Sequence, residues 1–423
     1  MVSRSIISTY LYYGYAFCDV DLDWIDTAPL NSPGGFSYTA DQAAKVFDAC
    51  VNDILYRSAK GGLCIVPLSG GWDSRMLLGA ALERFETSQI KTGSFGVPGQ
   101  LDYDIGALVA KKFGLVHHAV DLSGIEVSWE GLLATAKEAP WTDVFDSHYN
   151  RYAVSQVARS EADFVLSGFF GDPTTGGHFS GVSSREAAIS DFIFKQRREK
   201  SLQLASPDFD PRVVLPPLAD ASAVAYSELL DFGIRQAYCI APIVTPLKRF
   251  TRWDGWVGEM STSGATVLAP FAQQQWAAYW QRAPKEAKAA QKLYLEMMRY
   301  KFPDLAAMPS KYSLGTKTKL GNFAARVQRR IQRQIDYAFP RLNLRYRAGL
   351  NYLDFARAFR FREDYRAVLD KAVAYLEANE IVPWLDLGGL IKKHMSYEEN
   401  YENAFLVLIG LALNLQTERE VTA

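Results

Sequence analysis

The sequence has 423 residues, of which 46 are lysine or arginine and 47 are aspartate or glutamate, giving a net charge of −1, and 48% are hydrophobic. These values are typical of a folded globular protein; they exclude a disordered or coiled-coil chain, and they give no support to nucleic-acid binding. The four cysteines, at positions 18, 50, 64 and 239, form no closely spaced pair, so neither a zinc site nor a disulfide framework is predicted.

No targeting segment is predicted. The first residues, MVSRSIISTYLYYGYAF, lack an apolar core followed by a small-residue cleavage site. The longest apolar run, AFLVLIGLAL from Ala404, is about half of the roughly 20 residues that span a bilayer. We therefore expect a cytoplasmic protein in which this run forms a buried helix.

Residues 1–45 are expected to form an N-terminal extension that is irregular to about residue 40, with APLNSPGGFS as its clearest turn cluster. A helix is predicted next, because Ala43, Phe47, Cys50 and Ile54 recur at spacings of three and four. Short apolar runs that predict strands then alternate with helical patterns, the strands at 63–68, 90–95 and 116–122 and the helices at 76–85 and 102–114. This alternation predicts βαβ units and a parallel sheet.

After residue 124 helical patterns dominate, with one more predicted strand at 162–168 and little strand signal beyond residue 183. The fold class is therefore α/β, a parallel sheet with flanking helices followed by a mainly helical C-terminal half. We expect three regions: the extension at 1–45, the α/β unit at 46–315 and a helical region at 316–423.

The turn after the first predicted strand reads LSGGWDS. A glycine-rich turn between a buried strand and a helix exposes backbone N–H groups beside the positive end of the helix dipole, which suits a phosphate. Gly70 and Gly71 permit close approach, and Ser69 and Ser74 add hydroxyl donors. The Asp73 carboxylate is suited to hold Mg²⁺ on a polyphosphate. The sequence therefore predicts a polyphosphate site at this turn.

The turn lacks the lysine and the spacing of a Walker A loop. Its Ser-Gly-Gly-x-Asp-Ser order resembles the pyrophosphate loop of the PP-loop ATP pyrophosphatases, which have an adenine nucleotide alpha-hydrolase-like fold. Within that superfamily the chain resembles the synthase domain of asparagine synthetase. The resemblance rests on this loop and on four later segments: TGSFGVPGQLDYDIGALVAKKFGLVHHAV, SGFFGDPTTGG, GATVLAPF and MPSKYSLG.

The resemblance implies a two-step reaction with ATP and Mg²⁺. A carboxylate attacks the α-phosphorus of ATP and releases pyrophosphate, and ammonia or an amine then displaces AMP to form an amide. The resemblance places Asp172 beside Asp73 as a magnesium ligand, Lys311 and Asp172 in catalysis, and Gly96 and Gly168 with the loop residues at the nucleotide.

The chain departs from the family pattern at several positions. Phe169 and Thr266 stand where the asparagine synthetases have glutamates, Leu268 replaces an arginine, and Phe170 and Pro173 also break the loop pattern. Phenylalanine cannot act as a general base, so aspartate is not the expected substrate.

The nitrogen source is a second departure. Val2 occupies the place of the glutaminase nucleophile, and the stretch before Val46 is too short for a glutaminase domain. We therefore expect the nitrogen to come from ammonia, an amine or a separate glutaminase.

Other polar residues are open to two interpretations. His117 and His118 are expected to pack structurally, with nucleotide contact as the alternative, and Asp102 and Asp104 fit helix capping and a nucleotide contact equally well. The remaining candidates are His178, which could face the site, Glu259, which is more typical of a solvated carboxylate than of a base, and His148 and His394, which we interpret as structural.

Residues 317–347 carry nine basic side chains and one acidic one, Asp336. Phe323, Val327 and Ile331 begin an apolar stripe of every fourth residue that continues to Ile335 and Phe339. Such a stripe is most often a core-facing surface, and this is the favoured interpretation. The alternative is an amphipathic helix that lies on an anionic membrane or binds an acidic partner.

The sequence thus predicts an ATP-dependent amide-forming ligase acting on a small-molecule or glycan carboxylate, with a carboxylated sugar of a bacterial surface polysaccharide as the preferred class. Closure of a peptide or lactam ring and a non-catalytic nucleotide-binding scaffold remain as alternatives. A PP-loop enzyme acting on RNA finds no support in the charge or the cysteines.

Overall fold

A computed structural model of the chain describes residues 4–13, 37–58, 62–138, 140–141, 143–158, 160–168, 171–177, 204–210, 265–313, 323–324, 327, 330–331 and 353–422. The strands are β1 (Cys64–Pro67), β2 (Ile90–Gly96), β3 (Val116–Asp121), β4 (Phe164–Leu166) and β5 (Thr266–Leu268). The helices of the α/β part are α2 (Ala40–Ser58), α3 (Asp73–Leu82), α4 (Leu101–Lys112), α5 (Trp129–Glu138), α6 (Val144–Val157), α7 (Gly171–Thr174), α12 (Gln274–Arg282), α13 (Lys285–Lys288), α14 (Lys292–Lys301) and α15 (Pro303–Ala306), with 3₁₀ turns η1 (Thr87–Gln89), η5 (Pro270–Ala272) and η6 (Ala289–Gln291). The remaining helices are α1 (Arg4–Tyr13), α17 (Phe355–Phe361), α18 (Glu363–Ala378), α19 (Leu387–Met395) and α20 (Glu402–Thr422).

The five strands form one parallel sheet in the order β3-β2-β1-β4-β5. The four predicted strands are confirmed. The fifth strand, β5, was not predicted. The expectation of little strand signal after residue 183 was wrong at Thr266–Leu268. This strand has only three residues, and it forms because β4 offers it a ladder from Phe164 to Leu166.

Helices cover both faces of the sheet. Cys64, Val66 and Leu68 point to one face, where they pack with α2, α3, α12 and α14 in the largest hydrophobic cluster. Ile65 points to the opposite face and packs in a cluster with Val154 and Val157 of α6 and with Val165 of β4. The continuous apolar runs of β1 and β4 follow from this, because strands of a parallel sheet are buried on both sides.

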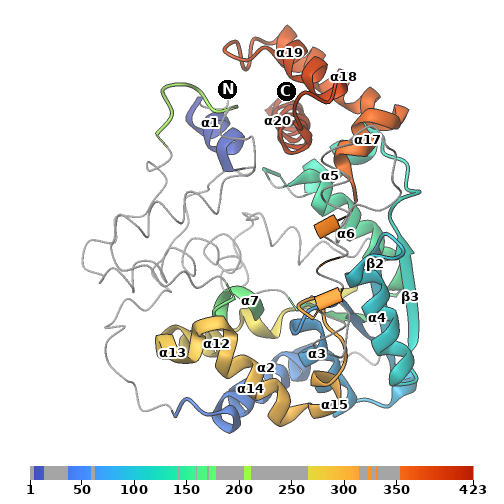
Figure 1. Cartoon of the computed structure of the whole chain (residues 1–423), viewed down its shortest axis with the longest axis vertical. Helices are drawn as coiled ribbons and strands as arrows, with labels where there is room; N and C mark the ends of the chain where they lie inside the picture. Colours follow the sequence, from blue (N-terminus) through green and yellow to red (C-terminus); the bar gives the residue numbers. More distant parts are fainter. Residues whose placement is uncertain are drawn as a thin grey trace.

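A second large cluster joins α1, α5, α6 and α17 to α20 (Figure 1). The apolar run from Ala404 lies in its centre, so the prediction of a buried helix is confirmed. In the described part of the chain, none of the helices has the length and apolar character needed to cross a membrane. The expectation that residues 1–40 are irregular was wrong for α1, in which Tyr10 and Leu11 are buried in this cluster.

The apolar stripe of the basic segment is solvent-exposed where the structure describes it. Phe323, Val327 and Ile331 are helical residues with 66%, 41% and 56% of their surface exposed. The favoured interpretation of these three as core residues was therefore wrong. Ile335 and Phe339 lie outside the described residues.

The contact between α1 and α20 depends on a glycine. A Cβ added at Gly410 would overlap the hydroxyl of Tyr10, whose ring is 1% exposed and also packs edge-on against Trp141. Alanine normally favours a helix over glycine by about 1 kcal/mol. Here we expect Gly410→Ala to destabilise the protein by about 1 to 3 kcal/mol, because the crowded tyrosine cannot move without loss of packing.

Thermal unfolding of the purified variant measures this effect. Gly388→Ala in α19 is the matched control, because the space around that glycine is almost empty, and it should raise the melting temperature. Equal shifts for the two variants would contradict the packing of α1 on α20.

Candidate active site

The order of the strands reverses between β1 and β4. From β1 the chain proceeds to β2 and β3 on one side, whereas β4 and β5 lie on the other. In an open parallel sheet, ligands bind outside the carboxyl ends of the strands at such a reversal. The turn 68–72 leaves β1 at this point, and Ser167 and Gly168 leave β4 beside it.

The turn after β1 is held in a defined shape by its own hydroxyl groups. The Ser69 backbone N–H donates to the Ser74 hydroxyl at 3.2 Å, and the Gly71 N–H donates to the Ser69 hydroxyl at 3.1 Å. Helix α3 begins at Asp73, and no side chain caps its N-terminus. The positive end of the helix dipole therefore meets the turn, as the sequence predicted.

The segment after β4 packs directly on this turn. A Cβ at Gly168 would lie 3.1 Å from the Cβ of Asp73 and 3.3 Å from the Ser74 nitrogen. A Cβ at Gly171 would overlap the Asp73 carboxylate itself. The two glycines thus allow two strand ends to meet without a side chain between them.

The two predicted metal ligands are brought together. The backbone N–H of Asp172 donates a hydrogen bond to the Asp73 carboxylate, and the hydroxyl of Tyr294 donates to Oδ1 of Asp73 at 2.6 Å. Burial and the neighbouring charge of Asp172 together raise the pKa of Asp73 to about 7, although these hydrogen bonds and the charge of Lys311 act in the opposite direction. A cation between the carboxylates would relieve this repulsion.

The donor set fits Mg²⁺ bound to a polyphosphate. Within the described residues, no group of three or more His, Cys, Asp or Glu side chains could hold a metal ion. Mg²⁺ usually binds through one or two carboxylates and takes its other ligands from substrate phosphates and water. Asp73 and Asp172 supply such a pair at the mouth of the turn.

Lys311 lies against the same turn. Its backbone N–H donates to the Gly70 carbonyl at 2.9 Å, and its Nζ lies 3.8 Å from the point where a Cβ at Gly71 would be. Asp102 contributes from the start of α4, where its Oδ1 accepts from the Gly70 N–H at 2.8 Å and lies 4.0 Å from the Lys311 Nζ. Of the two interpretations of Asp102, the structure supports contact with the site.

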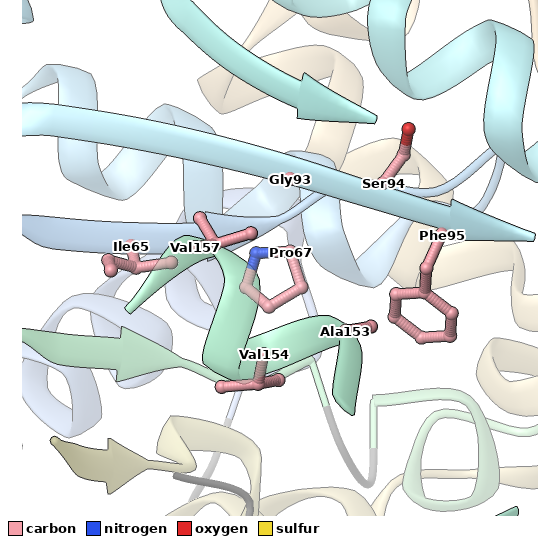
Figure 2. Close-up of a pocket in the computed structure, with 8 residues that line it drawn as sticks. All are labelled: Ile65, Pro67, Gly93, Ser94, Phe95, Ala153, Val154 and Val157. Atoms are coloured by element: carbon pink, nitrogen blue, oxygen red, sulfur yellow. The ribbon is translucent and has the colours of Figure 1, made fainter. Parts of the chain in front are cut away.

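A small apolar hollow, partly open to solvent, lies beside the end of β1 on the face covered by α6 (Figure 2). Pro67 and Phe95 point into it from β1 and β2, and Ala153 and Val154 close it from α6. Gly96 ends β2 next to Phe95, with a positive φ of 143° that favours glycine. The predicted nucleotide residue Gly96 thus lies beside the hollow.

The other candidate residues have mixed outcomes. His117 is structural, since its ring nitrogens bond the hydroxyls of Thr92 and Ser94 at 2.9 and 3.0 Å and burial lowers its pKa to about 4. His148 bonds Thr135 in the helical part, and His394 is fully buried, so both are structural as predicted. The residues Val2, Phe169, Phe170, His178 and Glu259 lie outside the described part.

Thr266 and Leu268, which stand where the family has charged residues, do not lie together in a polar pocket. Leu268 is buried in the largest hydrophobic cluster, and Thr266 is exposed at the start of β5. Asp104 bonds the Gly99 N–H at 3.1 Å, which is a local turn contact.

Sequence reasoning missed several residues of the site. Tyr294 reaches Asp73 across 221 residues, and Trp72 stacks on Tyr312 with ring centroids 6.3 Å apart and planes at 5°. Arg75 is fully buried behind the turn. Trp72 lies inside the motif and Arg75 directly follows it, and these positions were the one signal that the sequence offered. The partners of these residues lie on distant segments of the chain.

The contact between Gly171 and Asp73 gives a test of the carboxylate pair. We expect Gly171→Ala to weaken Mg²⁺-dependent binding of a nonhydrolysable ATP analogue by about 10-fold or more, because the added methyl displaces the Asp73 carboxylate. Isothermal titration calorimetry measures this, with Gly124→Ala, which meets open space, as the control. Unchanged affinity in Gly171→Ala would show that Asp73 does not serve the nucleotide.

The family model for asparagine synthase matches residues 43–313, which cover the sheet, the turn at Ser69 and Lys311. None of the curated proteins compared with the chain matches it. The match spans more than half of the chain, and the chain therefore belongs to the asparagine synthase family, whose members are ATP-dependent amide-forming synthetases.

Proposed function

We propose that this protein activates a carboxylate other than aspartate with ATP, releases pyrophosphate and transfers the acyl group to ammonia or an amine. The single observation that supports this most is the meeting of three elements at one edge of the sheet: the turn from Ser69 to Ser74, the Asp73 and Asp172 carboxylates, and Lys311.

ATP fits this edge in one orientation. Its phosphates would lie on the N–H groups of the turn at the N-terminus of α3, where partial positive charge favours an anion. Its base would lie towards Phe95 at the end of β2, beside the apolar hollow. Gly96 and Gly168 would border the nucleotide between these ends.

Charge neutralisation is the main catalytic task in the first step. A carboxylate oxygen forms a bond to the α-phosphorus, the bond from that phosphorus to the bridging oxygen breaks, and pyrophosphate leaves with the electron pair. Lys311 and the turn N–H groups would stabilise the growing negative charge. Asp73 and Asp172 would hold Mg²⁺, which when bound supplies further neutralisation of the phosphates.

In the second step the nitrogen forms a bond to the acyl carbon, and AMP leaves. The neutral residues Thr266 and Leu268 support a substrate other than aspartate, because an exposed threonine and a core leucine offer no charge to a second carboxylate or an ammonium group. We propose a carboxylated glycan as the acceptor class, with ring closure on a peptide as the competing chemistry.

Exchange of labelled pyrophosphate into ATP tests the reaction. The protein is incubated with Mg-ATP and a panel of uronic acids, glycan acids, amino acids and peptides, and we expect one acid class to support exchange. Asp172→Asn should reduce this exchange by about 100-fold or more, since an ionised ligand of the phosphates is lost. The control is Asp104→Asn, which alters a local turn and should retain activity.

Two outcomes would contradict the proposal. Absence of exchange and of AMP formation with every acid and amine would favour a nucleotide-binding scaffold. Equal activity in Asp172→Asn and the native protein would show that the carboxylate pair has no catalytic role.

A glycan acceptor carried by a phosphorylated lipid would be found at a membrane surface. The exposed residues Phe323, Val327 and Ile331, with exposed Arg330 and a segment 317–347 of strongly positive charge, fit an anionic lipid surface. We propose this surface as the place where the acceptor is met.

Vesicle sedimentation measures this contact. The protein should sediment with vesicles that contain anionic phosphatidylglycerol and remain in solution with zwitterionic ones, and Phe323→Asp with Ile331→Asp should abolish sedimentation. The matched control is Tyr300→Asp, which changes an exposed aromatic residue on α14 instead. Equal binding to both vesicle types, or none to either, would contradict the proposal.

A further inference from the structure

Arg75 is a buried cation on α3, two residues after Asp73. Its exposed fraction is 0%, and it is among the largest fully buried side chains. Among the described residues, no carboxylate forms an ion pair with it. A buried guanidinium without an acidic partner is costly, so its hydrogen bonds must offset the lost hydration. Burial lowers its pKa to about 10, which still leaves it charged at neutral pH.

All the hydrogen bonds that the structure gives to Arg75 go to one short segment of backbone. Nη1 donates to the carbonyls of Leu305 at 3.4 Å and Met308 at 3.0 Å, and Nη2 donates to the carbonyl of Pro309. This segment leaves α15 without forming another helix and ends at Lys311. The Leu305 carbonyl also accepts the Met308 N–H at 3.3 Å, whereas Met308 and Pro309 lie beyond the end of α15. The planar fork of an arginine can serve several carbonyls at once.

Two further contacts fix the same segment from the turn. The guanidinium lies over the ring of Trp72 at 5.0 Å, and Trp72 stacks on Tyr312, the residue after Lys311. The Gly70 carbonyl accepts the backbone N–H of Lys311. The turn and the first helical turn of α3 therefore hold the lysine segment before, at and after Lys311.

We propose that Arg75 is a positioning residue that sets the Lys311 ammonium against the phosphate-binding turn, acting through the carbonyls of residues 305 to 309. This inference rests on the proposed function for the role of Lys311. It makes the turn and the lysine one rigid unit: the element that receives pyrophosphate also places the cation that neutralises it. A lysine at position 75 would carry the charge but lacks the fork that bonds two carbonyls at a time.

A double-mutant cycle tests the coupling, with Mg-pyrophosphate as the probe in isothermal titration calorimetry. Lys311→Met should weaken binding by about 10-fold or more, which is the usual effect of losing a charged hydrogen-bond donor. Arg75→Met should weaken binding by a comparable factor. The double variant should bind no more weakly than Lys311→Met, because Arg75 acts through Lys311.

The reactivity of Lys311 gives a second readout that needs no ligand. The rate at which an amine-reactive reagent labels Lys311 is followed by mass spectrometry, with exposed Lys371 as the internal reference. Arg75→Met should change the Lys311 labelling rate by about 3-fold or more, because the ammonium is then no longer held against the turn. The rate at Lys371 should stay the same.

Arg84→Met, two residues beyond the C-terminal end of α3, is the matched control. Arg84 bonds Asp48 and Asn52 at the other end of α3, so its loss should lower the melting temperature without changing pyrophosphate affinity or Lys311 labelling. If Arg75→Met does not fold, Arg75→Lys keeps the charge and provides the same cycle.

The outcomes separate this inference from the proposed function. Additive losses in the cycle, or an unchanged Lys311 labelling rate in Arg75→Met, would overturn the positioning role while leaving the amide chemistry intact. If the native protein does not bind Mg-pyrophosphate, the proposed function fails, and the labelling rate alone still decides whether Arg75 positions Lys311.

Discussion

The structure depends on bringing two carboxylates from separate strand ends into contact. Asp73 follows β1 and Asp172 follows β4, and the Asp172 N–H bonds the Asp73 side chain. Burial and the second negative charge raise the pKa of Asp73, so the folded protein holds a proton there more tightly than the unfolded chain does. The stabilisation from that proton is present at low pH and is lost as the pH rises towards about 7. A cation bound between the two carboxylates would offset the repulsion that ionisation of Asp73 creates, which is why we propose Mg²⁺ with a polyphosphate at this pair.

Around this pair the chain arranges its donors and its positive charge in layers. Tyr294 donates to Asp73 from α14, and burial together with the two carboxylates keeps the pKa of its phenol high, so it remains a donor. Lys311 lies across the turn and is half-exposed, where a phosphate can reach it. Arg75 lies behind the turn and is sealed from solvent. Lys311 faces the proposed ligand, and Arg75 holds the backbone segment that carries Lys311.

The sequence predicted the part of this arrangement that is local. Strand β1, the turn and α3 form a continuous segment, so the strand-turn-helix order around Ser69 to Ser74 could be predicted from residue types and spacing. The role of this turn as an anion site stays a prediction. The fold class followed from the alternation of strands and helices up to residue 168. Helix α1 was missed because its Ile, Thr and Tyr residues favour strands, and its packing on α20 over about 400 residues of separation is invisible in a local pattern. Strand β5 was missed because three residues are too few to show a period.

The contacts that complete the site were beyond sequence reasoning for the same reason. Arg75 has the spacing of an ordinary polar residue on a helix, and its burial arises from a segment more than 200 residues later. Tyr294 occurs in a helical pattern where an aromatic residue predicts core packing, and that packing is also observed. The resemblance to the family located Lys311 and Asp172, but Arg75 lies outside the quoted motifs.

The most direct measurement of the central claim is a crystal structure of the protein with Mn²⁺ and pyrophosphate, with the metal located by its anomalous scattering. The account predicts one metal peak at the carboxylates of Asp73 and Asp172, with pyrophosphate oxygens on the N–H groups of residues 72 to 74 and beside the Lys311 ammonium. A metal bound elsewhere, with an empty turn and the two carboxylates apart, would contradict it.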